Sequence, residues 1–218
     1  MMDNVDNVNV IEVKDVNLII GKEHILHDIS VSFEKGKIHG LVGRNGSGKT
    51  MLMKCICGFV RYTDGEIRVD GLRIGKDIDF PKNIGIIIET PGFIPYYSGY
   101  KNLKLLAGLK NNIGRKEIEE TIELVGLDPK LKKSVRKYSL GMRQRLGMAQ
   151  AIMENPEILV LDEPMNGLDK QGVNDMRELL MKLKEQGKTI ILASHSTEDI
   201  EILCDTVHEM DKGVISEM

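Results

Sequence analysis

The chain has 218 residues, enough for one large domain or two small ones and enough to bury a hydrophobic core. Charged residues make up 29% of it and the net charge is −3, so no basic excess can neutralise a phosphate backbone, and we expect no nucleic-acid partner. The sequence contains no signal-peptide pattern and no apolar run near the ~18 residues of a membrane span, so we expect any membrane role to come through a separate chain.

The first half of the chain has the pattern of a β-rich segment. Residues 1–9 are polar and repeat Asp-Asn-Val, which predicts a flexible N-terminal segment. Residues 10–20 and 25–33 alternate or run apolar around a glycine turn, which predicts a hairpin of two strands. Further short strands are predicted at residues 38–42, 66–70 and 84–88.

The most informative segment follows the strand predicted at 38–42 and precedes a predicted helix. It fits the pattern G-x-x-x-x-G-K-[ST] without a mismatch and comprises Gly43, Arg44, Asn45, Gly46, Ser47, Gly48, Lys49 and Thr50. In such a loop, backbone N–H groups and a helix N-terminus surround the phosphates of a nucleotide. Lys49 can neutralise the β- and γ-phosphates, and the Thr50 hydroxyl can ligate Mg²⁺. The loop therefore predicts a nucleoside triphosphate site.

Helical spacing dominates the middle of the chain, and strands return after it. Helices are predicted at residues 102–109, 116–125 and 142–153, then at 170–186 and 197–204. Strands are predicted at residues 158–161, 189–193 and 206–210. This alternation predicts a largely parallel sheet covered on both faces. The predicted fold class is α/β: a P-loop NTPase core with antiparallel N-terminal strands and an inserted helical subdomain.

Two carboxylates follow the strand predicted at 158–161. Asp162 and Glu163 would lie at the carboxyl edge of the parallel sheet, where ligands bind in such folds. Asp162 can hold Mg²⁺, and Glu163 can orient and polarise an attacking water. Beside a phosphate loop, this pair predicts phosphoryl-transfer chemistry.

Three further motifs resemble those of ATP-binding cassette (ABC) ATPases. The segment Tyr138-Ser139-Leu140-Gly141-Met142 resembles the family's signature sequence, although Leu140 and Met142 depart from its commonest form. Residues 166–169, ending in Asp169, resemble the D-loop, and His195 in Ser-His-Ser resembles the switch histidine. With the phosphate loop and the Asp162-Glu163 pair, five motifs occur in the family's order, and the resemblance spans about residue 10 to the end of the chain.

The resemblance implies one ABC ATPase domain over residues 10–218. Its core would comprise residues 10–90 and 155–218, and its helical subdomain residues 91–154. Such domains hold ATP and Mg²⁺ between two copies and hydrolyse ATP. A polytopic membrane permease holds them at the cytoplasmic face of the cell membrane and uses the closing and opening of the pair for transport. In this arrangement, catalytic and phosphate-binding residues of one copy face the signature of the other. They would be Lys49, Thr50, Asp162, Glu163 and His195 opposite Ser139 and Gly141, with Asp169 nearby.

Two residues depart from the family's pattern near the expected nucleotide. Glu89 stands where the family usually has a metal-reaching glutamine, and a carboxylate can still ligate Mg²⁺. Ile20 stands where an aromatic residue usually stacks on adenine, so we expect apolar packing by Ile20, or His24 nearby, and weaker discrimination between ATP and GTP.

Glu89, Leu140 and Met142 resemble a subgroup of the family, the ATPases of lantibiotic and bacitracin-type immunity systems and related peptide exporters. This resemblance implies export of peptides or peptide antibiotics through a separate permease. The alternatives are a soluble ABC-type ATPase and the ATPase subunit of an importer. The loop at residues 91–97 concentrates three aromatic residues, and we expect it to form part of a groove for the permease.

Overall fold

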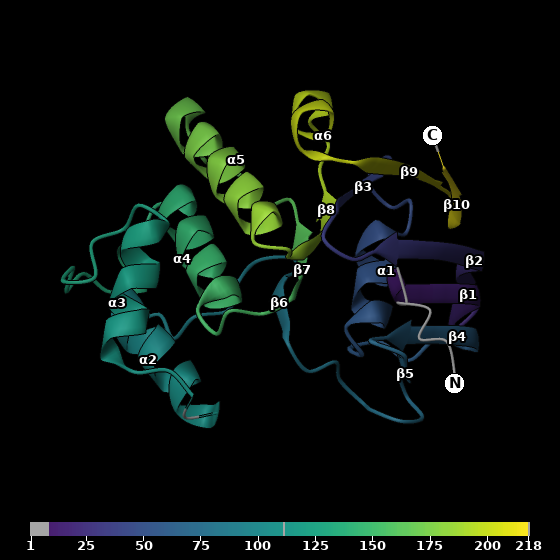
Figure 1. The fold of residues 1–218 in the computed structure, drawn as a ribbon, viewed down its shortest axis with the longest axis horizontal. Coiled ribbons are helices and arrows are strands. Elements are labelled where there is room, and N and C mark those ends of the chain that lie inside the picture. Colours follow the sequence, from purple (N-terminus) through teal and green to yellow (C-terminus); the bar gives the residue numbers. More distant parts are fainter. Residues whose placement is uncertain (1–8, 111, 218) are drawn as a thin grey trace, which may run out of the picture.

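The computed structural model describes residues 9–110 and 112–217. Two β-sheets and a group of helices follow one another along the long axis of the molecule (Figure 1). The antiparallel sheet lies at one end, the mainly parallel sheet in the middle, and the helices of the inserted subdomain at the other end. Within the described ranges, no helix is both long enough and apolar enough to cross a membrane.

The antiparallel sheet has the strand order β2-β1-β4-β5 and contains the predicted hairpin. Its strands are β1 (Asn9–Ile20), β2 (Glu23–Glu34), β4 (Asp64–Val69) and β5 (Leu72–Arg73). Asn9, which the sequence pattern assigns to a flexible segment, is the first residue of β1 and pairs with Glu34. Residues 1–8 of that segment lie outside the described residues.

The second sheet has the order β10-β9-β3-β8-β7-β6 and is parallel except for β10. Its strands are β3 (Ile38–Val42), β6 (Ile84–Ile87), β7 (Ile158–Asp162), β8 (Thr189–Ala193), β9 (Thr206–Asp211) and β10 (Val214–Glu217). The predicted largely parallel sheet is confirmed. The short strands β5 and β10 were not predicted, because a few residues after a tight turn carry little periodic signal.

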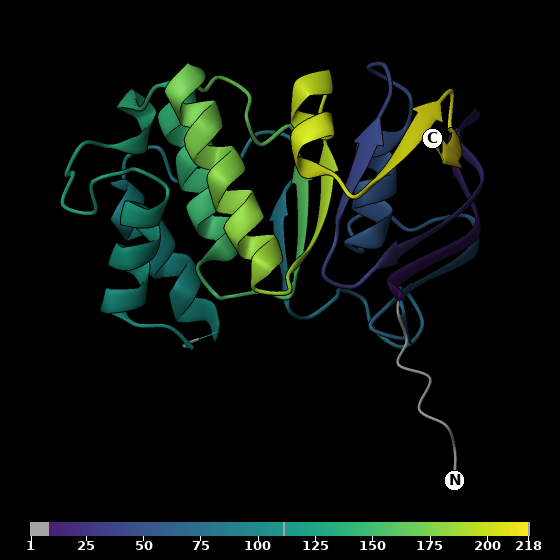
Figure 2. The same cartoon turned by 45° about the horizontal axis from the view of Figure 1, so that its top comes forward.

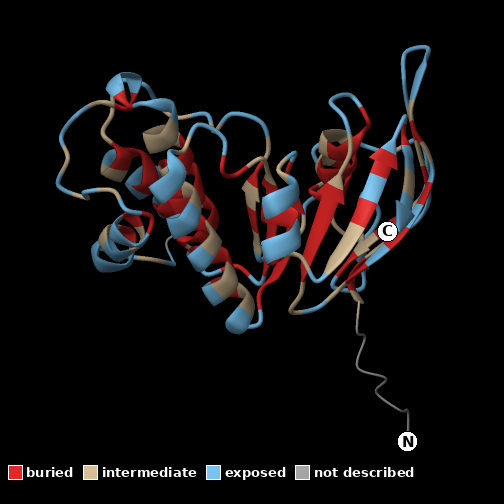
Figure 3. Cartoon of the chain, turned by 90° about the horizontal axis from the view of Figure 1, so that it is seen from above, coloured by how far each residue is buried: buried red, intermediate tan, exposed pale blue. Residues whose placement is uncertain are grey.

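Both faces of the inner strands of the parallel sheet are covered, which explains the apolar runs of β7 and β8. Ile158 and Val160 of β7 pack with helix α1 (Lys49–Ile56) and the antiparallel sheet. Leu159 and Leu161 point the other way, into a core shared with helices α2 to α5. Figure 3 shows the inner strands of this sheet largely buried, while the outer faces of the helices are exposed.

The helical subdomain lies between β6 and β7 in the chain. It contains α2 (Gly99–Lys110), α3 (Arg115–Leu124), a 3-10 turn (Val135–Lys137) and α4 (Leu140–Ile152). Helices α5 (Lys170–Glu185) and α6 (Thr197–Leu203) follow β7 and β8 and lie close together in a second view (Figure 2). Helix α4 packs in the core on one face of the parallel sheet and α1 in the core on the other, so the two helices lie on opposite faces.

Candidate nucleotide site

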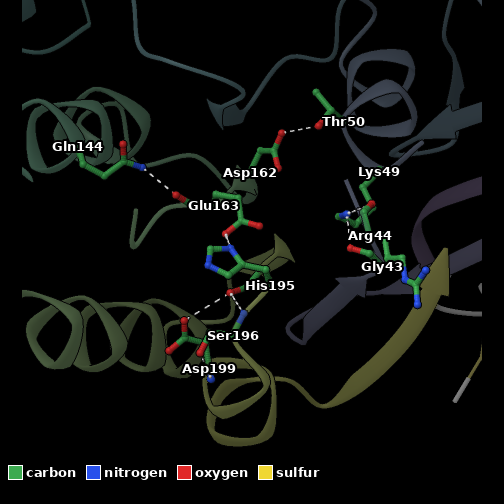
Figure 4. A network of polar contacts seen from close by, with 11 residues as sticks. Gly43, Arg44, Lys49, Thr50, Gln144, Asp162, Glu163, His195, Ser196 and Asp199 are labelled. Carbon is green, nitrogen blue, oxygen red and sulfur yellow. Dashed lines mark hydrogen bonds and ion pairs between the residues drawn. The ribbon is translucent and has the colours of Figure 1, made fainter. Parts of the chain in front are cut away.

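The phosphate loop joins the end of β3 to the start of α1. Gly43, Gly46 and Gly48 all have positive φ, at 142°, 81° and 109°. A Cβ atom on Gly43 would lie 2.2 Å from the carbonyl oxygen of Met210, so this position requires glycine. The buried Lys49 ammonium donates to the carbonyl oxygens of Gly43 at 2.7 Å and Arg44 at 3.1 Å (Figure 4). The loop therefore has the backbone of a phosphate cradle, with a cation held inside it.

Thr50 and Asp162 are brought together from α1 and β7. The Thr50 hydroxyl donates to Asp162 Oδ2 at 2.7 Å. Both groups are hard oxygen donors, which suit Mg²⁺. No cluster of three or more His, Cys, Asp or Glu residues that could hold a metal exists among the described residues. Two protein oxygens still fit Mg²⁺, because this ion usually keeps water and substrate phosphates as its other ligands.

Glu163 and His195 form the second pair at this edge of the sheet. His195 follows β8, and its Nδ1 lies 2.7 Å from Glu163 Oε2. This contact assigns the proton to Nδ1 and leaves Nε2 free to face a ligand. The imidazole is 69% exposed, whereas the glutamate side chain is 24% exposed. A carboxylate held in this way can orient water, and the histidine can move a proton or hold a phosphate oxygen.

The segment that carries His195 is fixed by a buried network between α5 and α6. Asp199 is 3% exposed, and its Oδ1 accepts from Arg177 Nη2 at 2.5 Å. Hydrogen bonds to Glu198 and Asp199 raise the pKa of the Arg177 guanidinium. The Ser194 hydroxyl accepts from the Ser196 N–H at 3.1 Å. Our sequence interpretation missed this network, although Ser196-x-x-Asp199 fits the pattern of a helix-capping box.

Glu89, the expected third metal ligand, has a different partner here. It follows β6 with φ of 59°, and Lys54 Nζ lies 2.6 Å from its Oε1. Lys54 is one helical turn beyond Thr50 on α1, so the two residues lie on the same face of the helix. The structure therefore joins Thr50 to Asp162 but pairs Glu89 with Lys54. The sequence interpretation missed Lys54.

The signature residues lie at the start of α4. Ser139 is exposed and caps the helix by accepting the Met142 N–H at 3.1 Å. A Cβ atom on Gly141 would lie 2.8 Å from the carbonyl oxygen of Gly167, so the signature packs on residue 167 of its own chain. Since α4 and α1 lie on opposite faces of the sheet, Ser139 and Gly141 are not brought to the phosphate loop of the same chain.

The remaining predicted residues, Asp169, Ile20 and the alternative His24, lie at or near the ends of a helix or strand. Asp169 caps α5, where its Oδ1 accepts the Gly172 N–H at 2.8 Å. Ile20 ends β1 and is 49% exposed, so an apolar surface is available near the hairpin turn. The His24 ring contacts Asn17 at 2.9 Å and the His27 ring at a centroid distance of 3.8 Å, so His24 already has partners within the hairpin.

A phosphate loop between a parallel strand and a helix, with two carboxylates at the end of a neighbouring strand, defines a P-loop NTPase. Comparison with known proteins refines this class. The profile of the ABC transporter family matches residues 26–166. The chain therefore belongs to the ABC transporter family and is an ABC ATPase, which confirms the resemblance in its motifs.

Its sequence relatives include several ABC transporter ATP-binding proteins. An uncharacterised one from Bacillus subtilis, YybJ, is 46% identical over 94% of each chain. The bacitracin transport ATP-binding protein BcrA from Enterococcus faecalis is 42% identical over 95% of this chain and 68% of that protein. The lantibiotic transport ATP-binding protein SrtF from Streptococcus pyogenes is 34% identical, over 94% of this chain and 89% of that protein.

Solved ABC cassettes share the fold. The dimeric cassette MJ0796 superposes with a TM-score of 0.86 at 23% identity, over 95% of this chain and 97% of that one. The same cassette in a post-hydrolysis dimer with ADP and Pi gives 0.85, at the same identity and coverage. The predicted fold class is thus confirmed.

Proposed function

We propose that this ABC ATPase binds ATP and Mg²⁺ between two copies of itself and hydrolyses ATP to drive export of peptides or peptide antibiotics. A separate polytopic permease would hold it at the cytoplasmic face of the cell membrane. One observation supports the proposed dimer. The phosphate loop and the signature lie on opposite sides of the parallel sheet, so one chain presents two separate halves of a nucleotide site.

The residues at the phosphate loop supply binding and charge. Lys49 leaves its backbone partners to neutralise the β- and γ-phosphates, while the N–H groups of Gly43–Thr50 surround them. Thr50 and Asp162 would hold Mg²⁺, which supplies charge stabilisation of the phosphates when bound. Lys54 would compete with the metal for Glu89, because its ammonium already contacts Oε1 of that carboxylate.

Glu163 and His195 would act on the attacking water. Glu163 orients the water and accepts its proton, and His195 keeps the carboxylate in place through Nδ1. In-line phosphoryl transfer needs positioning and charge stabilisation more than covalent chemistry, so this pair suffices.

The second copy would supply Ser139 and Gly141. Ser139 is exposed, and it stands at the N-terminus of a 13-residue helix, where backbone N–H groups and the helix dipole favour an anion. A γ-phosphate held by both copies is the contact that differs between open and closed dimers, so ATP would close the pair and hydrolysis would open it.

A groove between β6 and α2 suits the permease. It has a volume of about 790 Å³, and its mixed polar and apolar lining includes three of the most exposed large apolar side chains, Phe59 at 54%, Phe80 at 58% and Leu109 at 82%. A groove with such exposed apolar side chains can receive the apolar face of an amphipathic helix from a partner. Such a helix from a cytoplasmic loop of the permease is the occupant we propose.

The loop at residues 91–97 contributes less to this groove than we expected. Pro91 and Gly92 line it, but Phe93 is partly buried against the helical core. Tyr97 lies beneath the Lys101 ammonium, with Nζ 3.6 Å from the ring centroid.

Leu109 is the better residue for a test, because it lines the groove and is exposed. Substituting Leu109 with Ser should uncouple transport and spare basal ATPase activity, whereas substituting Phe93 would also damage the core.

Export of peptides rests on two observations. Glu89, Leu140 and Met142 resemble the subgroup, and the relatives BcrA and SrtF are named for bacitracin and lantibiotic transport. An importer subunit and a soluble ABC-type ATPase are the alternatives. Co-purification with a polytopic membrane protein, and peptide efflux from cells that contain both, would separate the three.

The Glu163→Gln variant tests the site directly. It keeps the size of the side chain but removes the base, so turnover should fall by at least about 100-fold while ATP still binds. Light scattering should then detect an ATP-dependent dimer that ADP does not support. Normal turnover in this variant would refute the assigned base, and a monomer at all ATP concentrations would refute the shared site.

A further inference from the structure

Gln144 joins the signature helix to the backbone of Glu163. Its Nε2 donates to the Glu163 carbonyl oxygen at 3.1 Å, and the residue is 6% exposed. Figure 4 shows the amide pointing from α4 toward Glu163. Gln144 lies five residues after Ser139, in the second turn of α4. One buried side chain thus connects the exposed start of this helix with the catalytic segment.

The backbone of Glu163 needs such support. Its φ is 51°, in the left-handed region that residues other than glycine seldom adopt. Its N–H donates to the Ala193 carbonyl at 2.9 Å, and its carbonyl also accepts the Asn166 N–H at 3.2 Å. A strained residue keeps its conformation only when its surroundings hold it. Gln144 provides the hold from the helical subdomain.

A second contact ties α4 to the same segment. A Cβ atom on Gly167 would lie 2.4 Å from Cγ of Leu140, and one on Gly141 would lie 2.8 Å from the Gly167 carbonyl oxygen. Residues 163–167 therefore meet α4 at both ends, through Gln144 and through the signature. Close packing of this kind transmits small displacements instead of absorbing them. A shift of α4 would move this segment with it.

We infer that Gln144 is a positioning residue for Glu163. When the signature end of α4 engages a nucleotide, Gln144 sets the position of the Glu163 carboxylate. The inference rests on the proposed dimer. There, Ser139 faces the nucleotide held by the second copy, whereas Glu163 acts on the nucleotide of its own chain. Gln144 then links the two sites within one chain, so that occupancy of one site favours turnover at the other.

The test compares Gln144→Met with a matched buried amide. Methionine keeps the length and volume of glutamine but cannot donate. The control is Asn102→Leu, because Asn102 is 4% exposed and its Nδ2 donates to the carbonyls of Ile94 and Ser98 within the helical subdomain. ATP hydrolysis by the full-length protein is measured against ATP concentration, together with the thermal unfolding midpoint of each variant.

Gln144→Met should lower kcat by about 10-fold to 100-fold, since a small misplacement of a catalytic group is costly, and leave the half-saturating ATP concentration little changed. Its Hill coefficient should fall toward that of independent sites. In a Glu163→Gln background, Gln144→Met should still form the ATP-dependent dimer, because the signature surface is intact. Asn102→Leu should lower the unfolding midpoint similarly but keep kcat and the Hill coefficient.

Normal kcat and Hill coefficient in Gln144→Met would overturn the inference, and so would an equal loss of kcat in Asn102→Leu. A failure of the proposed function would give a result different from these two outcomes. In that case, Glu163→Gln itself would hydrolyse ATP normally. If Glu163→Gln is inactive and Gln144→Met is normal, the catalytic assignment stands and the positioning role alone is wrong.

Discussion

His195 and Glu163, 32 positions apart in the sequence, meet through a 2.7 Å contact between Nδ1 and Oε2. Each stands at the end of its own parallel strand, β8 or β7, and these strands are neighbours in the sheet. The contact gives the carboxylate one orientation, and it leaves the second imidazole nitrogen free.

His195→Ala should therefore lower the turnover of ATP by about 100-fold or more, because Glu163 loses its orienting partner and the site loses a proton-transfer group. Binding of ATP should be little affected, since the phosphate loop is untouched. Single-turnover hydrolysis and equilibrium binding of a fluorescent ATP analogue measure the two effects separately. A parallel loss of both would assign His195 to binding instead.

Glu89 and Lys54 offer a test of the metal site. Glu89→Gln removes a charged oxygen donor and should raise the Mg²⁺ concentration needed for half-maximal hydrolysis. Lys54→Met removes the competing ammonium and should lower it. The pair is exposed on the glutamate side, so each shift should stay within about 5-fold, and stability should change by less than about 1 kcal/mol. Shifts in the same direction would show that Glu89 is not a ligand.

Two glycines should respond oppositely to alanine. A Cβ atom on Gly85 in β6 would lie 2.0 Å from the Ala151 carbonyl oxygen in α4, so Gly85→Ala should destabilise the protein by about 2–3 kcal/mol. Gly108 lies in α2 with open space around it, so Gly108→Ala should stabilise by about 0.5–1 kcal/mol. Urea unfolding measures both. Equal effects would contradict the close approach of α4 to β6.

Two histidines in the parallel sheet should make stability depend on pH. His39 and His208 are 1% and 6% exposed, the Phe33 ring contacts both, and His208 Nε2 has no hydrogen-bond partner among the described residues. Burial lowers the pKa of each histidine below its usual value. Below about pH 6.5, the unfolded chain therefore binds more protons at these histidines than the folded protein does. The free energy of unfolding should decrease as the pH falls through this range.

The decrease should reach at most about 1.4 kcal/mol per pH unit for each histidine, and stability should be flat with respect to these two groups above about pH 7.5. His208→Phe should reduce the decrease, whereas the exposed His24→Gln should keep it. The measurement is the free energy of urea unfolding at several pH values. A decrease of unchanged size in His208→Phe would assign it to other groups.

Much of the site could be predicted from the sequence because its parts are local. The eight residues from Gly43 to Thr50 are consecutive, and their glycines, lysine and threonine define a backbone shape and a donor set together. The inner strands β7 and β8 appear as apolar runs because burial on both faces disfavours polar residues. The signature and the Asp162-Glu163 pair are also made of consecutive residues, so each can be found as a short motif at the end of a predicted element.

Other relationships were decided only by the tertiary structure. Lys54 and Glu89 are 35 positions apart, and no local pattern indicates that a helix face and a strand end will meet. Gln144 reaches Glu163 only because α4 packs against the sheet face opposite α1. Helical periodicity predicts that a helix has an apolar face but not which surface it covers. The sequence by itself therefore determined the phosphate loop and the strands, and packing between distant segments decided what holds the Glu163 carboxylate.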